Sequence, residues 1–346
     1  MAFIKYKHMW LIGLMMVSGI VTFGGTGCGK SSSSSALTGP FVYFTGPGLY
    51  KVNINGGSVG TVAYTPTPGG LAADSTSLYF YSSSSGLNKV AKDNNPNGNG
   101  IINLTTNIQP PMAAPSTWMA VDSSNVYWIG GSNGNGSVQK ISINGGTVTT
   151  LASGLPSPVS IAVDSNNVYW TDRTGSVSKV PVNSGPVTTL YDGSSFGAAP
   201  LGIAVDNGNV YWGEAELSGS VFTGGAIKKI SVNGLTVTTL ASGLTSPTDL
   251  TVDSQNVYWI EYPGWTTSST PASIMQVGIN GGPVTTLATG QTDAKGIVVD
   301  STSVYWLDSC QSGSSTGSVQ KAPINGGTVT AIASGLTNPG NIAIDR

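Results

Sequence analysis

From residue 41 onward, short runs of β-branched and aromatic residues alternate with turn-forming residues. The clearest unit occupies residues 161–190 and contains four runs, the second of which reads Val-Tyr-Trp-Thr-Asp and the fourth Pro-Val-Thr-Thr-Leu. Asp-Ser, Gly-Ser and Asn-Gly-Gly sequences separate runs of this kind, as turns between antiparallel strands do. Each unit therefore predicts a four-stranded antiparallel sheet, and no helical period of useful length appears after residue 40.

The unit recurs with a tyrosine in its second run, at spacings of 36 to 48 residues. These tyrosines are Tyr43, Tyr79, Tyr127, Tyr169, Tyr211, Tyr258 and Tyr305. Four-strand units at this spacing are typical of the blades of a β-propeller. The sequence therefore predicts an all-β fold, a seven-bladed β-propeller of four-stranded antiparallel blades over residues 41–346.

The two ends of this region complement each other. Residues 342–345 read as one innermost strand with its turn Asp, whereas residues 41–44 read as a second strand without its first. We expect the C-terminal strand to complete the first blade, so that strand exchange closes the ring without an open sheet edge.

The literal sequence Tyr169-Trp170-Thr171-Asp172, with Val-Tyr-Trp in four other units, resembles the YWTD-repeat propellers and the related NHL-like, virginiamycin-lyase-like and gluconolactonase-like groups. The resemblance implies a propeller fold. It does not select one function, since such propellers include enzymes, receptors and scaffolds. YWTD propellers usually have six blades, so the count of seven is a departure.

The N-terminal segment has the layout of an export signal. Residues 1–27 contain two lysines, an apolar run from Met9 to Phe23 and then small residues before Cys28. A membrane-spanning helix is the alternative, but crossing needs about 20 residues. The segment resembles a bacterial lipoprotein signal that lipidates Cys28, although Gly25 stands where Leu is usual, and Gly29 implies the outer membrane.

The predicted organisation is accordingly a signal peptide over residues 1–27, a lipidated Cys28 with a Ser-rich linker to residue 40, and the propeller. The predicted location is the cell envelope, with the lipid as the contact to the membrane.

Two strings imitate ligand-binding motifs. Residues 24–31 match the phosphate-binding pattern GxxxxGK[ST], but that loop needs a strand before it and a helix after it. Residues 93–98 match the start of a calcium loop, but Leu104 stands where its bidentate Glu belongs. We interpret the first string as part of the export signal and the second as an enlarged hairpin turn.

The composition excludes several kinds of partner and active site. Only 9% of residues are charged and the formal net charge is −2, so no basic patch predicts a nucleic-acid partner. The single histidine, His8, lies in the segment expected to be removed, which excludes histidine-based catalysis in the mature chain. Cys310 would then have neither a disulfide partner nor a histidine to activate it.

One face of the predicted ring carries uniform Asp and Asn-Gly-Gly turns, whereas the loops of the other face differ between units. Differences within a regular array often carry function. Two positions after the Trp or Phe of the second run, the last four units have an acidic arc. The candidate ligand-binding residues are Asp172, Arg173, Glu214, Glu261, Tyr262, Trp265 and Asp308.

Bracing of the loops between blades is the alternative role for the four carboxylates. A divalent cation at the channel mouth is a further possibility, which would need Asp249 and Asp293 to converge with an acid of the arc, because blades lie about 10 Å apart. No other cofactor is predicted.

Three functions remain open, the third of which is an envelope assembly factor that uses a sheet edge. The first is a non-enzymatic, lipid-anchored binding or scaffold propeller for an envelope protein or glycan. The alternative is a divalent-metal-dependent, lactonase-like hydrolase with carboxylate ligands at the channel mouth.

Overall fold

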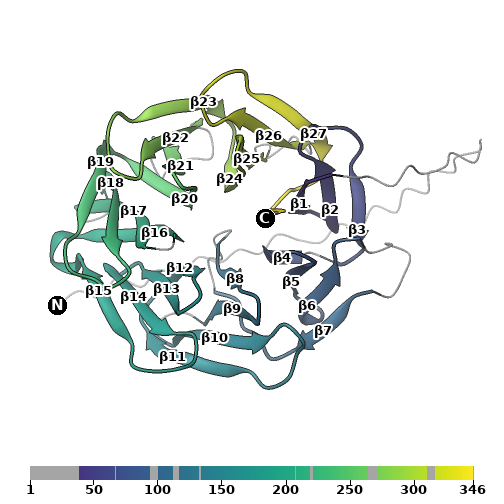
Figure 1. Ribbon diagram of the computed structural model, residues 1–346, viewed down its shortest axis with the longest axis horizontal. Coiled ribbons are helices and arrows are strands. Elements are labelled where there is room, and N and C mark those ends of the chain that lie inside the picture. The colour runs from purple at the N-terminus through teal and green to yellow at the C-terminus, as the bar shows by residue number, and fades with distance from the viewer. Residues whose placement is uncertain are drawn as a thin grey trace, which may run out of the picture. The chain divides into compact units, whose positions relative to one another are not determined.

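The computed structural model describes residues 39–66, 68–93, 100–111, 117–131, 134–206, 208–218, 221–263, 271–309 and 316–345. These residues form 28 strands in seven four-stranded antiparallel sheets arranged in a ring, together with one 3-10 helix, η1 (Ser194–Phe196) (Figure 1). The predicted seven-bladed β-propeller is confirmed. In this part of the chain, no helix has the length and apolar character needed to cross a membrane.

The blades are numbered in ring order, and the strands of each blade run from the channel to the rim. Blade 1 contains β28 (Ile342–Ile344), β1 (Phe41–Thr45), β2 (Leu49–Asn53) and β3 (Gly60–Ala63). Blade 2 contains β4 (Pro68–Ala73), β5 (Ser77–Ser82), β6 (Gly86–Ala91) and β7 (Ile102–Thr105). Blade 3 contains β8 (Met119–Val121), β9 (Asn125–Gly130), β10 (Gly136–Ser142) and β11 (Thr149–Leu155).

The remaining four blades follow the same order. Blade 4 contains β12 (Pro158–Val163), β13 (Asn167–Asp172), β14 (Ser176–Pro181) and β15 (Thr188–Asp192). Blade 5 contains β16 (Ala198–Val205), β17 (Asn209–Ser218), β18 (Val221–Ser231) and β19 (Thr238–Leu244). Blade 6 contains β20 (Ser246–Val252), β21 (Asn256–Tyr262), β22 (Ala272–Gly278) and β23 (Thr285–Gln291). Blade 7 contains β24 (Ala294–Val299), β25 (Ser303–Asp308), β26 (Gly317–Pro323) and β27 (Thr330–Leu336).

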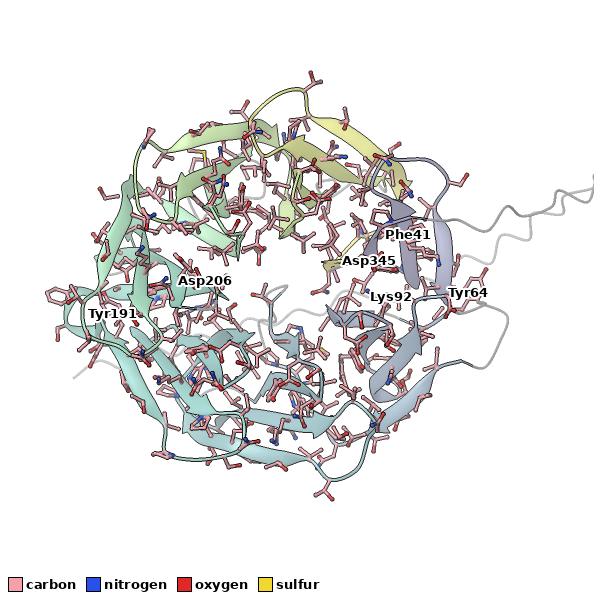
Figure 2. All side chains as sticks on the ribbon, in the orientation of Figure 1. Phe41, Tyr64, Lys92, Tyr191, Asp206 and Asp345 are labelled. Atoms are coloured by element: carbon pink, nitrogen blue, oxygen red, sulfur yellow. The ribbon has the colours of Figure 1, made fainter. Side chains whose placement is uncertain are left out.

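The C-terminal strand closes the ring as predicted. β28 pairs antiparallel with β1, with Tyr43 opposite Ala343. Asp345 then accepts hydrogen bonds from the backbone N–H of Phe41 at 2.8 Å and from Nζ of Lys92 at 2.6 Å (Figure 2). Blade 1 is therefore assembled from both ends of the propeller region.

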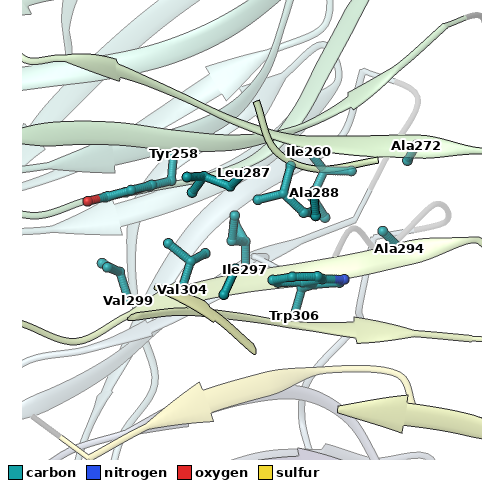
Figure 3. Packing of buried hydrophobic residues seen from close by; sticks show 12 residues of the cluster. Tyr258, Ile260, Ala272, Leu287, Ala288, Ala294, Ile297, Val299, Val304 and Trp306 are labelled. Carbon is teal, nitrogen blue, oxygen red and sulfur yellow. The ribbon is translucent and has the colours of Figure 1, made fainter. Parts of the chain in front are cut away.

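The hydrophobic core lies between neighbouring blades. Side chains of successive strand residues point to opposite faces of a sheet, so alternate residues of a second strand contact different neighbours. In β25, Val304 and Trp306 pack against Tyr258 and Ile260 of blade 6 (Figure 3), whereas Tyr305 packs on the side of blade 1. The Val-Tyr-Trp run thus supplies both interfaces of its own blade.

The strand order gives the ring two distinct faces. The first-to-second and third-to-fourth turns of each blade lie on one face, which we call the turn face. The second-to-third loops and the connections between blades lie on the other, which we call the loop face.

On the turn face of blades 2 to 7, an Asp at the end of the inner strand organises the turn that follows. In blade 4, Oδ1 of Asp164 accepts the backbone N–H groups of Asn166 and Asn167 at 2.7 Å, and Oδ2 accepts the hydroxyl of Tyr169 at 2.8 Å. The same three bonds recur at Asp74, Asp122, Asp206, Asp253 and Asp300. These six acids therefore have a structural role.

Lysines on the third strands connect one blade to the next. Each donates from Nζ to a backbone carbonyl beside the third-to-fourth turn of the following blade, at 2.5 to 3.2 Å. The pairs are Lys51 to Lys92, Lys89 to Ile143, Lys140 to Val182, Lys179 to Val232, Lys229 to Ile279 and Lys321 to Ile54. Blade 6 has Gln276 at the corresponding position, opposite Tyr258 in the ladder, and its Oε1 is buried without a hydrogen-bond partner among the described residues.

The inner strands of all seven blades surround a central cavity of about 220 Å³. Its lining consists of Leu, Ile, Val, Ala and Met side chains with Thr117, Thr251 and Gly296. The side chains that line the channel are therefore mostly apolar, and the charged residues that the sequence singled out lie outside this lining.

Candidate functional site

The acidic arc lies at the loop-face ends of the second strands of blades 4 to 7. Asp172, Glu261 and Asp308 accept backbone N–H groups from the connection that leads into their own blade. Three of the four carboxylates therefore contact the same kind of group, fifteen or sixteen residues earlier in the chain. This geometry is the one expected if the carboxylates stabilise the loops between blades.

Asp172 is the most fully engaged of the three. Its Oδ2 accepts the N–H of Ser157 at 2.9 Å, and its Oδ1 accepts both the N–H and the hydroxyl of Thr174, at 2.9 and 2.6 Å. The residue is 1% exposed. The neighbouring Arg173 is half-buried, and its backbone N–H donates to the carbonyl of Ser157. Asp172 therefore holds two loops together.

Glu214 has a different set of partners. It forms an ion pair with Lys228 on the adjacent strand β18 and accepts the indole N–H of Trp212 at 3.2 Å. Lys228 also donates to the hydroxyl of Tyr191 from blade 4, whose ring lies 5.1 Å from that of Trp212. Glu214 is 1% exposed, so this ion pair is largely buried within blade 5, and the bond from Lys228 to Tyr191 connects it to blade 4.

Glu261 is only partly buried. Oε1 accepts the N–H of Thr245 at 2.6 Å and Oε2 accepts the indole N–H of Trp259 at 3.0 Å. Burial raises the pKa of this carboxyl, and the hydrogen bonds from Thr245, Trp259 and Ser246 act in the opposite direction. Glu261 thus stabilises the connection into blade 6 and also accepts the indole N–H of a tryptophan on its own strand.

At the junction of blades 6 and 7, several titratable groups lie near one another. The hydroxyl of Tyr262 donates to the carbonyl of Ala294, and Asp293 forms a 2.7 Å ion pair with Lys295. Burial raises the pKa of Asp308 to about 6, and the nearby negative charge of Asp293 adds to this effect. Within the described residues, Oδ1 of Asp308 is buried without a hydrogen-bond partner.

Burial also raises the pKa of the Tyr262 phenol, and the charges of Asp293, Asp249 and Asp308 add to that effect. This group, which we call the mouth cluster, comprises Asp249, Tyr262, Asp293, Lys295 and Asp308.

Asp249 and Asp293 were the predicted metal ligands. Oδ2 of Asp249 accepts the N–H of Gly296 at 3.0 Å, and both residues have positive φ angles, 33° for Asp249 and 55° for Asp293. Among the residues that the structure describes, no group of three or more His, Cys, Asp or Glu is placed to hold a metal ion. A cation at the channel mouth stays a prediction.

Three residues named from the sequence lie outside the described residues: Cys28, Trp265 and Cys310. The same holds for the expected signal peptide, for residues 28–38 of the expected linker and for most of the calcium-loop-like string.

The sequence reasoning missed Lys228 and Tyr191. A signal was present, because the residue that pairs with the Trp of the second strand is uncharged in neighbouring blades, such as Gln139, Ser178 and Met275. The Lys at position 228 breaks that pattern and could have pointed to Glu214 as its partner.

Comparisons with known proteins establish the fold. No family model matches the chain, and no curated protein matches it. A nidogen/laminin complex superposes with a TM-score of 0.51 at 15% identity, over 89% of this chain and 99% of the other. A putative 6-phosphogluconolactonase from Bacteroides fragilis gives a TM-score of 0.59 at 13% identity, over 91% of this chain and 99% of the other.

The tricorn protease gives a TM-score of 0.56 at 12% identity, over 84% of this chain and 34% of the other. At such identities the likeness shows the propeller fold alone. The resemblance to YWTD-type propellers therefore holds for the fold and the repeat, and proteins of quite different kinds share that architecture.

Proposed function

We propose that this chain is a lipid-anchored propeller of the cell envelope that binds a protein or glycan on its loop face, as a non-enzymatic binding or scaffold module. One observation carries the proposal. The turn face uses its Asp and Lys side chains to hold turns and blades together, whereas the loop face has a large excess of acids. The described acids on or toward the loop face are Asp172, Asp192, Glu214, Glu216, Asp249, Glu261, Asp293 and Asp308, against the bases Arg173, Lys228 and Lys295.

Eight acids and three bases give the described residues of this face a formal charge of −5. Asp172 and Glu214 are buried and Lys228 is paired with Glu214, so six acids and two bases, with a formal charge of −4, remain nearer the surface. Two aromatic side chains add contact area: Tyr64 is 67% exposed and Phe196 is 77% exposed, and both lie in connections between blades. Exposed aromatics beside polar groups suit both protein and sugar surfaces. Since a rigid ring presents these loops in fixed positions, binding would cost little ordering entropy.

The binding test compares two sets of exposed residues. Tyr64→Ser with Phe196→Ser should weaken capture of lipid-free envelope proteins and glycans, while Leu235→Gly on the turn face should leave it unchanged. Raising the salt concentration should weaken capture by the unaltered protein, because the loop face is acidic. Protease treatment of the envelope material removes a protein ligand and spares a glycan. Equal capture by all variants would refute the proposal for this face.

Anchoring at Cys28 has its own test. Cys28→Ser should release the exported protein from membranes, because the lipid supplies the apolar anchor. Retention of that variant in the membrane fraction would favour the apolar run from Met9 to Phe23 as an uncleaved anchor.

The second candidate is a divalent-metal-dependent, lactonase-like hydrolase. Asp249, Asp293 and Asp308 would be its carboxylate ligands and the bound ion would activate water, but these three acids are not placed to hold an ion together in the described structure and would have to converge on it. Elemental analysis after dialysis discriminates the two functions: one retained ion per chain, lost in Asp249→Asn with Asp293→Asn, would support the hydrolase. A metal-free protein that still captures envelope material would support the binding module.

A further inference from the structure

Most of the exposed large apolar residues that the structure describes lie on the turn face. Eight large apolar residues in the described part of the chain are exposed, and six of them lie at third-to-fourth turns or at the first residue of an outer strand. These six are Val59, Ile101, Ile102, Val187, Leu235 and Val284. They belong to blades 1, 2, 4, 5 and 6, so exposed apolar side chains are distributed around most of the turn face.

Leu235 is the most exposed of these residues, at 95%. It has a φ of 103°, at the turn position where blades 1 and 6 have Gly57 and Gly282 with φ of 121°. A non-glycine residue in this region is strained, because its Cβ crowds the backbone. The leucine therefore costs conformational energy and gains no packing within the protein, which points to a contact outside the chain.

The turn face is also close to electrical neutrality. Its seven turn acids are Asp74, Asp122, Asp164, Asp206, Asp253, Asp300 and Asp345, and its seven lysines are Lys51, Lys89, Lys92, Lys140, Lys179, Lys229 and Lys321. With Asp93, the described residues of this face have a formal charge of −1, against −5 for the described residues of the loop face. An anionic membrane surface would repel the loop face much more strongly than the turn face.

The polypeptide enters the propeller at the turn face. The carbonyl of Pro40 accepts the backbone N–H of Ile54, next to the third-to-fourth turn of blade 1, and β1 runs from there toward the loop face. About a dozen residues separate Cys28 from β1, and such a segment spans at most about 40 Å. A lipid on Cys28 would thus hold the ring near the bilayer from its turn-face side.

We infer that the turn face is a membrane-contacting surface, whose exposed apolar turns rest on the lipid bilayer and leave the acidic loop face directed away from it. The inference rests on the proposed anchoring of Cys28. It commits to phospholipid as the occupant, because the entry point of the chain and the neutral, apolar character coincide on this face.

The test attaches the propeller to vesicles without native lipidation. A protein with Cys28→Ser, Cys310→Ser and a hexahistidine tag before residue 29 is bound to vesicles of phosphatidylethanolamine and phosphatidylglycerol that contain a nickel-chelating lipid. A fluorophore is placed at V284C on the turn face or, as the matched control, at F196C on the loop face. Nitroxide-labelled lipid should quench the V284C probe several-fold more than the F196C probe.

Replacing the neighbouring turn residues, Val187→Ser with Leu235→Gly, should reduce quenching at V284C to the level of F196C while the melting temperature stays unchanged. Equal quenching at the two probe positions, or stronger quenching at F196C, would overturn the inference. Because the tag replaces the lipid, such a result would leave the Cys28→Ser test of anchoring unaffected. The two failures are therefore distinguishable.

Discussion

The phenol groups of the strand tyrosines show how single residues hold the turn face together. In blade 4 the hydroxyl of Tyr169 donates to Asp164, whose other oxygen organises the turn. Burial first, and then the bond to Asp164, raises the pKa of this phenol. The hydroxyl stays protonated at physiological pH and acts as a permanent donor.

Tyr169→Phe removes that donor and keeps the ring. Hydrogen bonds to charged groups contribute about 1.5 to 3 kcal/mol, so the free energy of unfolding in urea should fall by about 1 to 3 kcal/mol. Tyr64→Phe is the control, because its side chain is exposed, and should change the value by less than about 0.5 kcal/mol. Equal stability of the two variants would show that the phenol–Asp bond is dispensable.

Asp308 gives a prediction about pH. Its pKa is raised to about 6 in the folded state, whereas an unfolded Asp titrates near its ordinary value of about 3.9. The folded protein therefore binds this proton more tightly, and the resulting stabilisation is complete below about pH 4 and is lost as pH rises through 6.

Asp308→Asn should flatten the corresponding fall in melting temperature between about pH 4 and 7. Asp192→Asn is the control, since Ser194 lowers the pKa of Asp192 and its contribution has the opposite sign. An unchanged pH profile for Asp308→Asn would contradict the assignment.

The sequence anticipated the turn acids and the repeated tyrosines, but not the bonds between them. Asp164 and Tyr169 are five residues apart on two antiparallel strands, and their contact depends on how the turn brings those strands together. The arc was harder to interpret. A carboxylate that braces Ser157 and one that faces a ligand have the same spacing in the sequence, and only the path of the connecting loop separates them.

At the scale of whole strands, the third-strand lysines show why neighbouring blades stay in register. Each lysine spans the interface and satisfies a backbone carbonyl in the following blade. These lysines are visible in the sequence of every unit except blade 6. Their partners are not, because in five of the six cases the carbonyl lies 41 to 54 residues further along the chain. Such contacts follow from blade packing, which spacing alone does not reveal.

Gln276→Lys should supply the missing connection between blades 6 and 7, because the repeat places the carbonyl of Ile324 opposite this position. The expected gain is about 0.5 to 1.5 kcal/mol in the free energy of unfolding, the net contribution of one hydrogen bond. Lys179→Gln, the reverse change in blade 4, should lower it by a similar amount. A loss of stability in both variants would show that the blade 6 interface is built differently.

At the scale of the whole molecule, closure of the ring depends on β28, which contains three residues. Deleting residues 341–346 would remove the inner strand of blade 1 and expose the edge of β1 to other chains. The truncated protein should aggregate or melt at a much lower temperature, measured by light scattering during a thermal scan. Unchanged melting and solubility would contradict closure by strand exchange.

Lys92 makes this closure specific. Blades 1, 3 and 4 have Ile54, Ile143 and Val182 at the equivalent position, whereas blade 2 has a lysine that is only 8% exposed. Its partner Asp345 cannot organise a turn as the other six acids do, because no turn joins β28 to β1, which lies at the other end of the propeller sequence. The ion pair at 2.6 Å and the N–H of Phe41 take the place of the missing turn amides.

Lys92→Ile gives blade 2 the residue type of its neighbours and leaves Asp345 without its cation. We expect the free energy of unfolding to fall by about 1 to 3 kcal/mol, with amide hydrogen exchange accelerated in β28 and β1 before the other blades. Lys295→Met breaks a more exposed pair and should cost less than about 1 kcal/mol. In a double-mutant cycle, Asp345→Asn should add little to Lys92→Ile, because both changes remove the same contact. Additive losses, or unchanged exchange in β28, would mean that strand pairing alone closes the ring.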